Sequence, residues 1–408
     1  MDAGRIDLAE VLAQRGVSRR RFLKYCATMA AALALPPRFA FEIARGLQSS
    51  PRIPVIWLEG QDCAGNSEAL LRAEQPTISE LILQTLSLDH HHLLMAPSGK
   101  RTEKSIEDIL REFPNGYVAV IEGAIPLADG GVYCTIGGRA FAEVAREIVK
   151  GALATVAVGT CALDGGLPAA RGGLTGAVGV STWLNDPTIR LINLPGCPMN
   201  PDNLTALVIQ YLALQKWPEV DSLNRPLFAY GDQVHATCES LPHYRAKEFV
   251  KAWGDEGHRK GWCLYEMGCK GPSTDANCST LKFNGGTSWP VSSGHGCVGC
   301  TMPQFWDAMS PFYASGRPQV VPTPTPVDYR TPVPETRTPA PPGSTATPGS
   351  GPSSGDDDNG ALLIGLGAVA VAAAGGAGAF IAVRSRRGHD AGQNADDASP
   401  DEGTEEER

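Results

Sequence analysis

The chain has 408 residues, a length that predicts two or three domains. Of these residues 42% are hydrophobic, which is enough for a folded core. Its net charge is −9, but residues 388–408 hold eight acids and one base, a charge of −7, which leaves −2 for the rest. A nearly neutral body has no basic excess for a phosphate backbone, so we expect no nucleic-acid partner.

The N-terminal segment has the pattern of an export signal. Arg19 and Arg20 lie in the motif SRRRFLK, and an apolar run of small residues follows at 25–35. That run is shorter than the ~20 residues needed to span a bilayer. A basic segment before a short apolar run predicts a signal peptide, and the paired arginines predict the twin-arginine route. We expect residues 1–47 to be this signal and Cys26 to be removed with it.

The next part of the chain alternates between two kinds of segment. Short apolar runs predict buried strands at 53–58, 117–121, 154–158 and 189–194. Helical patterns lie at 67–73, 77–86, 105–112 and 139–151. This alternation predicts an α/β domain with a parallel, doubly wound sheet over residues 52–200. Cys63, Cys161 and Cys197 each follow one of the strands, where such sheets bind ligands.

Residues 201–315 begin with a predicted helix at 202–215 and then lose long periodic patterns. Seven potential metal ligands crowd into this loop-rich segment: His235, Cys238, Cys263, Cys269, Cys278, Cys297 and Cys300. Disulfides, zinc and iron–sulfur clusters all remain open. Iron–sulfur chemistry fits best, because four ligands suit a 4Fe–4S cluster and three thiolates suit a 3Fe–4S cluster.

The C-terminal part has the pattern of a tether, a membrane span and a tail. Residues 316–360 are rich in Pro, Thr, Ser and Gly, which is typical of a semi-rigid linker. Residues 361–383 contain no charge and no proline, and a helix of that length reaches about 35 Å, enough to cross a bilayer. Arginines follow at once, so we expect the acidic tail at 384–408 to be cytoplasmic.

Long segments of the chain resemble the small subunit of membrane-bound, uptake-type nickel–iron hydrogenases. The resemblance covers roughly residues 52–312, together with the signal and the C-terminal span. It is carried by VIWLEGQDCAGNSEALLR, VIEGAIPL, VGTCALDGG, INLPGCPMNP, GDEGHRKGWCLYEMGCKGP, NCSTL and WPVSSGHGCVGC. It implies a flavodoxin-like domain followed by a loop-rich iron–sulfur cluster domain.

The resemblance also implies a ligand set for each cluster. Cys63, Cys161 and Cys197 match a proximal 4Fe–4S cluster. Cys278, Cys297 and Cys300 match a medial cluster, which we expect to be 3Fe–4S because Pro290 stands where a fourth cysteine would complete it. The distal 4Fe–4S cluster matches His235, Cys238, Cys263 and Cys269. The expected cofactors are therefore two 4Fe–4S clusters and one 3Fe–4S cluster.

The fourth proximal ligand departs from the family pattern, because Asn66 stands where a thiolate is expected. Asp62 could supply a carboxylate, Asn66 an amide oxygen, or the cluster could lack an iron. Iron at a site of low dielectric favours an anionic ligand, so Asp62 is our preferred hypothesis. The six-cysteine proximal pattern of some oxygen-tolerant members is absent, since Ala64, Gly165 and Gly166 offer no thiol.

The resemblance implies an electron-transfer subunit. Dihydrogen is split at a nickel–iron centre on a separate large subunit, no catalytic residue lies on this chain, and electrons pass through the three clusters to a membrane cytochrome b or another quinone-linked acceptor. We expect the body on the outer face of the cell membrane, in a higher-order oligomer of heterodimers. The alternatives are a cluster-bearing structural or assembly partner and an electron-transfer subunit of another respiratory complex.

Two remaining features receive ordinary interpretations. Cys134 matches no ligand position and is interpreted as a buried structural thiol. Asp89, His90, His91 and His92 are interpreted as polar residues beside a helix end rather than as a metal site.

Overall fold

The computed structural model describes residues 19–33, 35–49, 52–74, 77–78 and 86–314, all within the first of two compact units, Met1–Thr338. The predicted linker, span and tail lie beyond these residues. Among the helices described, none combines the length and apolar composition needed to cross a bilayer, and the span expected at 361–383 is not among them.

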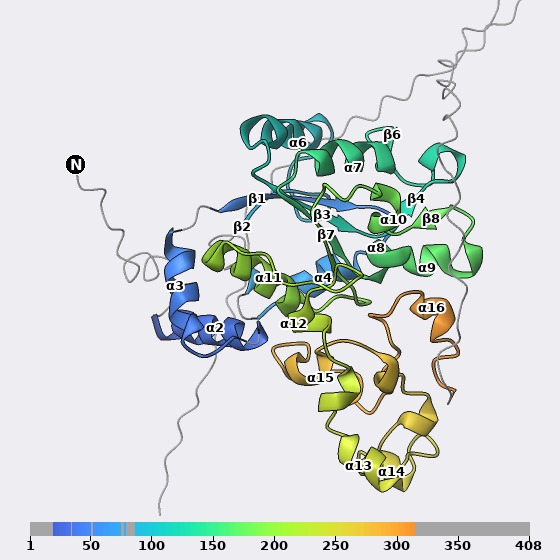
Figure 1. Ribbon diagram of the computed structural model, residues 1–408. Helices are drawn as coiled ribbons and strands as arrows, with labels where there is room; N and C mark the ends of the chain where they lie inside the picture. The colour runs from blue at the N-terminus through green and yellow to red at the C-terminus, as the bar shows by residue number, and fades with distance from the viewer. Residues whose placement is uncertain (1–18, 34, 50–51, 75–76, 79–85, 315–408) are drawn as a thin grey trace, which may run out of the picture. The chain divides into compact units, whose positions relative to one another are not determined.

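A five-stranded parallel sheet forms the core of the fold (Figure 1). Its strand order is β2-β1-β3-β7-β9, and every neighbouring pair is parallel. In chain order this is 2-1-3-4-5, the order of flavodoxin-like folds. The strands are β1 Ile53–Glu59, β2 Leu86–His91, β3 Val118–Glu122, β7 Ala154–Val158 and β9 Leu191–Leu194. The predicted α/β fold with a parallel sheet is confirmed.

Helices cover both faces of the sheet, because side chains of a strand alternate between its faces. Val55 and Trp57 of β1 pack with α4 (Gly65–Leu71) and α11 (Pro201–Leu214) in one apolar cluster. Ile56 and Leu58 belong to a second cluster with α6 (Lys100–Glu112) and α7 (Phe141–Lys150). Figure 1 shows these helix pairs on opposite sides of the strands. Strand β1 is therefore held on both faces.

Residues 89–91, which we interpreted as polar residues beside a helix end, lie in a strand. Leu86–His91 is β2, which pairs with β1 at the edge of the sheet. His90 and His91 are almost fully buried, and burial lowers the pKa of each to about 4. Of the helix predicted at 77–86, residues 79–85 lie outside the described part of the chain.

Most other predicted helices are present, with shifted ends. The helices expected at 67–73, 105–112 and 202–215 correspond to α4, α6 and α11. Residues 139–140 pair as a short strand instead, so α7 begins at Phe141. The start of α11 has a clear local cause, because the Asn200 side chain accepts a hydrogen bond from the Asp202 N–H at 3.0 Å and proline occupies the first turn.

A helical hairpin from the predicted signal packs against α11. It consists of α2 (Arg19–Ala32) and α3 (Phe39–Ser49). Cys26, Met29 and Ile43 are fully buried there, in a cluster that includes Ala206 and Ile209 of α11. The apolar run that was predicted to be part of a signal therefore has a folded packing site on the full-length chain.

Short elements dominate the remaining chain. Those before α11 are β4 Ile125–Pro126, η2 Ala128–Gly131, β5 Thr135–Ile136, β6 Arg139–Ala140, α8 Thr160–Asp164, α9 Gly166–Ala169, η3 Ala170–Gly172, β8 Ala177–Val178 and α10 Val180–Leu184. Those after it are α12 Leu227–Tyr230, η4 Val234–Thr237, α13 Leu241–Ala246, α14 Glu256–Arg259, η5 Tyr265–Met267, η6 Gly271–Ser273, α15 Cys278–Leu281 and α16 Phe305–Ala308. As predicted, this last segment is rich in loops.

Candidate metal centres

Three cysteines gather at one edge of the sheet. Cys63 follows β1, Cys161 lies in α8 just after β7, and Cys197 follows β9. Their thiols are close enough to interact electrostatically, Cys161 with Cys63 and Cys197 with both. Desolvation raises the pKa of Cys161 to about 11 and that of Cys197, whose surface is still partly open to solvent, to about 12. Desolvation therefore disfavours the thiolate forms of Cys161 and Cys197, which a bound metal would stabilise.

Asp62 has a carboxylate oxygen with no hydrogen-bond partner. Its Oδ1 accepts the Ala64 N–H at 2.9 Å, but its Oδ2 is buried and unpartnered. Burial is the main reason that the pKa of Asp62 rises to about 6, and the Asp62 charge also raises the pKa of Cys161. Because buried polar atoms are rarely left unpaired, Oδ2 is a free donor atom for a metal beside the three thiols.

The Asn66 side chain, in contrast, is fully engaged. Its Oδ1 accepts the Met199 N–H at 2.9 Å, and its Nδ2 donates to Glu122 Oε1 at 3.2 Å. Gly159 allows this close approach, since a Cβ at that position would lie 2.4 Å from Asn66 Nδ2. Asn66 is thus placed as a structural link between β3 and the Cys197 loop.

Glu122, which the sequence analysis did not single out, anchors the loop that carries Cys63. It ends β3, is fully buried, and accepts hydrogen bonds from Trp57 Nε1 at 3.1 Å and from the Asn66 N–H at 2.8 Å. Ser67 donates to it through both its N–H and its hydroxyl, at 3.1 and 2.6 Å. These donors include the first N–H groups of α4, where a negative charge is stabilised.

The four expected distal ligands line one cavity. His235 and Cys238 come from η4 and its end, and Cys263 and Cys269 flank η5. The His235 ring packs edge-on against Tyr244, with the centroids 4.6 Å apart. Its Nε2 is buried and has no hydrogen-bond partner. Three thiols and one unpaired imidazole nitrogen facing one cavity fit a Cys₃His cluster ligand set.

The three expected medial ligands are also brought together. The Cys278 thiol at the start of α15 interacts electrostatically with Cys300, and Cys297 interacts with both. Burial raises the pKa of all three thiols, to about 12 for Cys278. Pro290 lies in the turn before Cys297, where its carbonyl accepts the His295 N–H at 2.8 Å, and its side chain offers no ligand atom.

Hydrogen bonds join the three ligand sets in a line. Thr160 Oγ1, next to Cys161, donates to the Cys300 carbonyl, and the Cys197 backbone partly offsets the rise that burial causes in the pKa of the Cys300 thiol. The Cys297 N–H donates to Cys269 Sγ at 3.3 Å. Residues of the medial set therefore contact the proximal set at one end and the distal set at the other.

Two further observations describe the cysteines and the remaining residues. None of the eleven described cysteines is in a disulfide. Within the described ranges, no group of three or more His, Cys, Asp or Glu is arranged to hold a single metal ion. In an iron–sulfur cluster, each ligand binds a different iron.

Two family models match consecutive parts of the chain. Residues 63–211 match the model described as "NADH ubiquinone oxidoreductase, 20 Kd subunit". Residues 230–313 match the model of the C-terminal part of the NiFe/NiFeSe hydrogenase small subunit.

Curated relatives agree with these matches. The chain is 46% identical over 312 residues to the periplasmic [NiFe] hydrogenase small subunit 1 of Nitratidesulfovibrio vulgaris, covering 76% of this chain and 98% of the relative. It is 43% identical over 304 residues to the quinone-reactive Ni/Fe-hydrogenase small chain of Wolinella succinogenes, covering 74% and 85%.

Solved structures show the same relationship. A [NiFeSe]-hydrogenase chain from Desulfomicrobium baculatum superposes with a TM-score of 0.61 at 37% identity, covering 65% of this chain and all of that one. The actinobacterial-type NiFe-hydrogenase of Ralstonia eutropha H16 gives 0.60 at 26% identity, covering 66% and 84%.

Proposed function

Because the chain belongs to the family of nickel–iron hydrogenase small subunits, we propose that it relays electrons from dihydrogen oxidation on a large subunit through three iron–sulfur clusters to a membrane acceptor. The observation that carries this proposal is the pair of hydrogen bonds that join the three ligand groups, from Thr160 Oγ1 to the Cys300 carbonyl and from the Cys297 N–H to Cys269 Sγ. When bound, the clusters would supply one-electron redox chemistry. The chain's own residues hold them in order and exclude water.

The proposed ligands follow the three groups described above. Cys63, Cys161 and Cys197 hold the proximal 4Fe–4S cluster, and Cys278, Cys297 and Cys300 hold the medial 3Fe–4S cluster. The distal 4Fe–4S cluster is held by His235, Cys238, Cys263 and Cys269. The unpaired His235 Nε2 and the absence of a ligand atom on the Pro290 side chain support these assignments. The proposed domains are 52–200 and 201–315.

For the fourth proximal ligand we retain Asp62. Its unpaired Oδ2 supports this choice, as does the engagement of both amide atoms of Asn66. The carboxylate brings a negative charge to a site where a neutral amide would leave the iron less well compensated.

The large subunit is proposed to dock at the proximal edge. Cys63 and Cys197 are exposed there, and the segment after Cys161 carries Leu167 and Leu174, which are 56% and 96% exposed. This segment lies beside Cys63, because Thr175 Oγ1 donates to Gln61 Oε1 at 3.0 Å. Exposed apolar side chains around a cluster site are typical of a protein interface that shields it from water.

The cellular placement remains part of the proposal. We propose export by the twin-arginine route through Arg19 and Arg20, a membrane anchor at 361–383 and a body on the outer face, with a cytochrome b or other quinone-linked acceptor and an oligomer of heterodimers. The names of a periplasmic relative and a quinone-reactive relative support this placement.

Metal analysis of the purified complex tests the proposal. We expect nickel from the partner and about 11 iron per small subunit, with an oxidised 3Fe–4S signal in low-temperature EPR that disappears under dihydrogen. About one iron fewer, with two 3Fe–4S signals, would show that no side chain replaces the fourth proximal thiolate. Zinc without nickel would refute the electron-relay function and favour a structural or assembly partner.

A further inference from the structure

A buried arginine, Arg225, contacts residues beside the proximal and the medial ligands. Arg225 is 5% exposed. Its Nε donates to Asp221 Oδ2 at 2.7 Å, and a terminal nitrogen donates to Asp275 Oδ2 at 3.2 Å. The other terminal nitrogen donates to the carbonyl of Thr301 at 3.3 Å and lies 3.8 Å from Met302 Sδ. The guanidinium is therefore fixed by contacts on all of its nitrogens.

Two partners of Arg225 lie in the segments that carry the medial thiols. Thr301 follows Cys300 directly, and Asp275 precedes Cys278 by three residues. The two segments are also joined to each other, since Thr301 Oγ1 donates to the Asp275 carbonyl at 2.8 Å and the Asp275 N–H donates to Met302 Sδ at 3.3 Å. Arg225 thus sets the spacing of the segments on which Cys278 and Cys300 depend.

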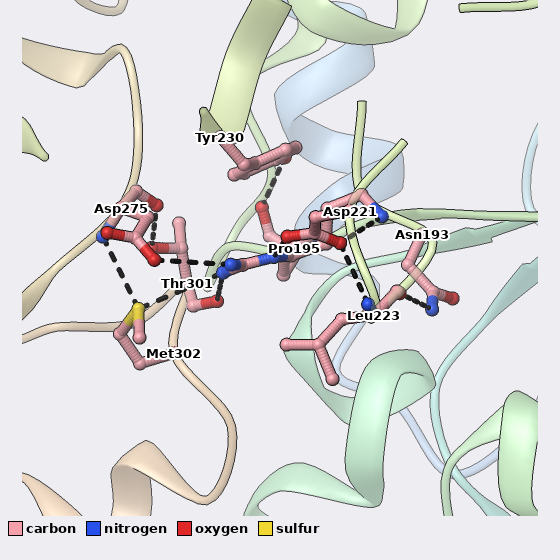
Figure 2. A network of polar contacts seen from close by, with 9 residues as sticks. Asn193, Pro195, Asp221, Leu223, Tyr230, Asp275, Thr301 and Met302 are labelled. Carbon is pink, nitrogen blue, oxygen red and sulfur yellow. Dashed lines mark hydrogen bonds and ion pairs between the residues drawn. The ribbon is translucent and has the colours of Figure 1, made fainter. Parts of the chain in front are cut away.

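The same side chain reaches the proximal side through Tyr230. The Arg225 guanidinium lies over the Tyr230 ring, 5.7 Å from its centroid. The buried Tyr230 hydroxyl donates to the carbonyl of Pro195 at 2.8 Å, two residues before Cys197. Figure 2 shows the contact between Tyr230 and Pro195 and the contacts among Asp275, Thr301 and Met302.

The charges around Arg225 are buried to different depths. The Arg225 side chain is 6% exposed, whereas Asp221 and Asp275 are 20% and 30% exposed. Water screens the two carboxylates more than the guanidinium, which donates to the carbonyl of Thr301 directly after Cys300, so its positive charge is the less attenuated one beside that ligand. A nearby positive charge stabilises the reduced, more negative form of a cluster and raises its reduction potential.

We propose that Arg225 is a positioning residue for the medial cluster, where it holds the two ligand-bearing segments together and raises the reduction potential of the cluster. This inference rests on the proposed function, because it requires a cluster on Cys278, Cys297 and Cys300. It adds a residue that binds no iron and is separated from the thiols by backbone.

Redox titration of the oxidised 3Fe–4S EPR signal in the purified complex tests the proposal with two variants of opposite sign. Arg225→Gln keeps a polar side chain but leaves both carboxylates uncompensated, so the midpoint potential should shift to lower values. Asp275→Asn leaves the guanidinium less compensated, so it should shift to higher values. The distal signal should move less than the medial signal in both variants, because Arg225 contacts no distal segment in the described chain.

The exposed Arg190, which lies over Trp217, provides a matched control, and Arg190→Gln should leave the medial potential unchanged. Unchanged medial potentials in both variants, or shifts of the same sign, would overturn the proposal. If Arg225→Gln does not assemble, the Asp275→Asn shift decides. A wild-type complex without any 3Fe–4S signal would refute the proposed function instead.

Discussion

The backbone N–H of Cys297 donates a hydrogen bond to Sγ of Cys269, 3.3 Å away. One expected medial ligand therefore supports an expected distal ligand through a single peptide group. Burial raises the pKa of the Cys269 thiol, and this hydrogen bond, with one from Gly271, partly offsets the effect. A hydrogen bond to sulfur stabilises the thiolate and helps to set the potential of the cluster that it holds.

Asp62→Ala should remove the fourth proximal ligand. We expect the proximal site to lose about one iron and to gain a 3Fe–4S-type EPR signal, while the distal and medial signals stay unchanged. Asn66→Ala should leave the iron content and spectrum intact but lower the stability by about 1–3 kcal/mol, because Glu122 and the Met199 N–H lose a buried partner. The reverse pattern would identify Asn66 as the ligand.

Pro290→Cys should convert the medial cluster. The backbone carbonyl that accepts the His295 N–H is retained, and the new thiol supplies a fourth ligand. Iron should rise from about 11 to about 12 per small subunit, and the oxidised 3Fe–4S signal should disappear. Pro290→Ser is the control that offers no thiolate. Retention of the 3Fe–4S signal in a well-folded cysteine variant would argue against this ligand set.

Glu122→Gln should destabilise the proximal edge. The variant presents an amide N–H to donors such as Trp57 Nε1 and Ser67, so a buried group stays unpaired, at a cost of about 1–3 kcal/mol. For a unit of this size the melting temperature should fall by about 2–4 °C for each kcal/mol. Glu107→Gln, on the exposed face of α6, should change stability by less than about 0.5 kcal/mol. Equal melting temperatures for the two variants would contradict the anchoring role of Glu122.

The buried histidines of β2 should make stability depend on pH. Burial lowers the folded-state pKa of His90 from 6.5 to about 4, so between these values the unfolded chain binds more protons. The contribution of the neutral His90 to the free energy of unfolding is fully present above pH 6.5 and is lost as the pH falls toward 4, at about 1.4 kcal/mol per pH unit. His90→Gln should reduce the slope of the unfolding free energy against pH by that amount, as measured by urea denaturation. An unchanged slope would mean that His90 is accessible to protons in the folded state.

Gly46→Val should detach the α2–α3 hairpin from α11 in the unprocessed chain. A Cβ at Gly46 would lie 2.3 Å from the Cα of Ala213, so the helices cannot keep their present distance. We expect faster proteolysis within 19–49, measured by mass spectrometry of the fragments. Ala27→Val, on the exposed side of α2, should digest like the wild type. Equal digestion of all three chains would show that the hairpin does not depend on this contact.

The central sheet could be predicted because four of its strands are short, mainly apolar runs. The fifth, β2, was missed because its sequence, LSLDHH, contains four polar residues. Pairing with β1 buries His90 and His91, and His90 reaches Ser105 and His91 reaches Ser67 at 3.1 Å. A pattern that counts histidine as polar does not reveal such a strand.

The expected ligands could be located because cysteine spacing and strand ends are local signals. The residues that hold these ligands in place could not be located in this way, because Glu122 and Arg225 act through partners far away in sequence. One signal was available for Glu122, because a lone carboxylate at the end of the apolar run VAVIE is a buried charge in need of partners. Nothing comparable marks Arg225, whose hydrogen-bond partners other than Asp221 lie 50 to 77 residues away.

The proximal edge emerges from the ribosome early but is completed by residues that emerge late. Thr160 and Asp164 receive their partners from Cys300 and Gln304, 140 residues further along the chain, and Asp307 accepts the Arg171 N–H at 2.8 Å. A nascent chain that stops before Cys300 contains every strand of the central sheet but lacks the residues that hydrogen-bond to Thr160 and Asp164, on either side of Cys161. The proximal and medial sites can therefore both be completed only when the last residues of the body, from Cys300 to Asp307, have been translated.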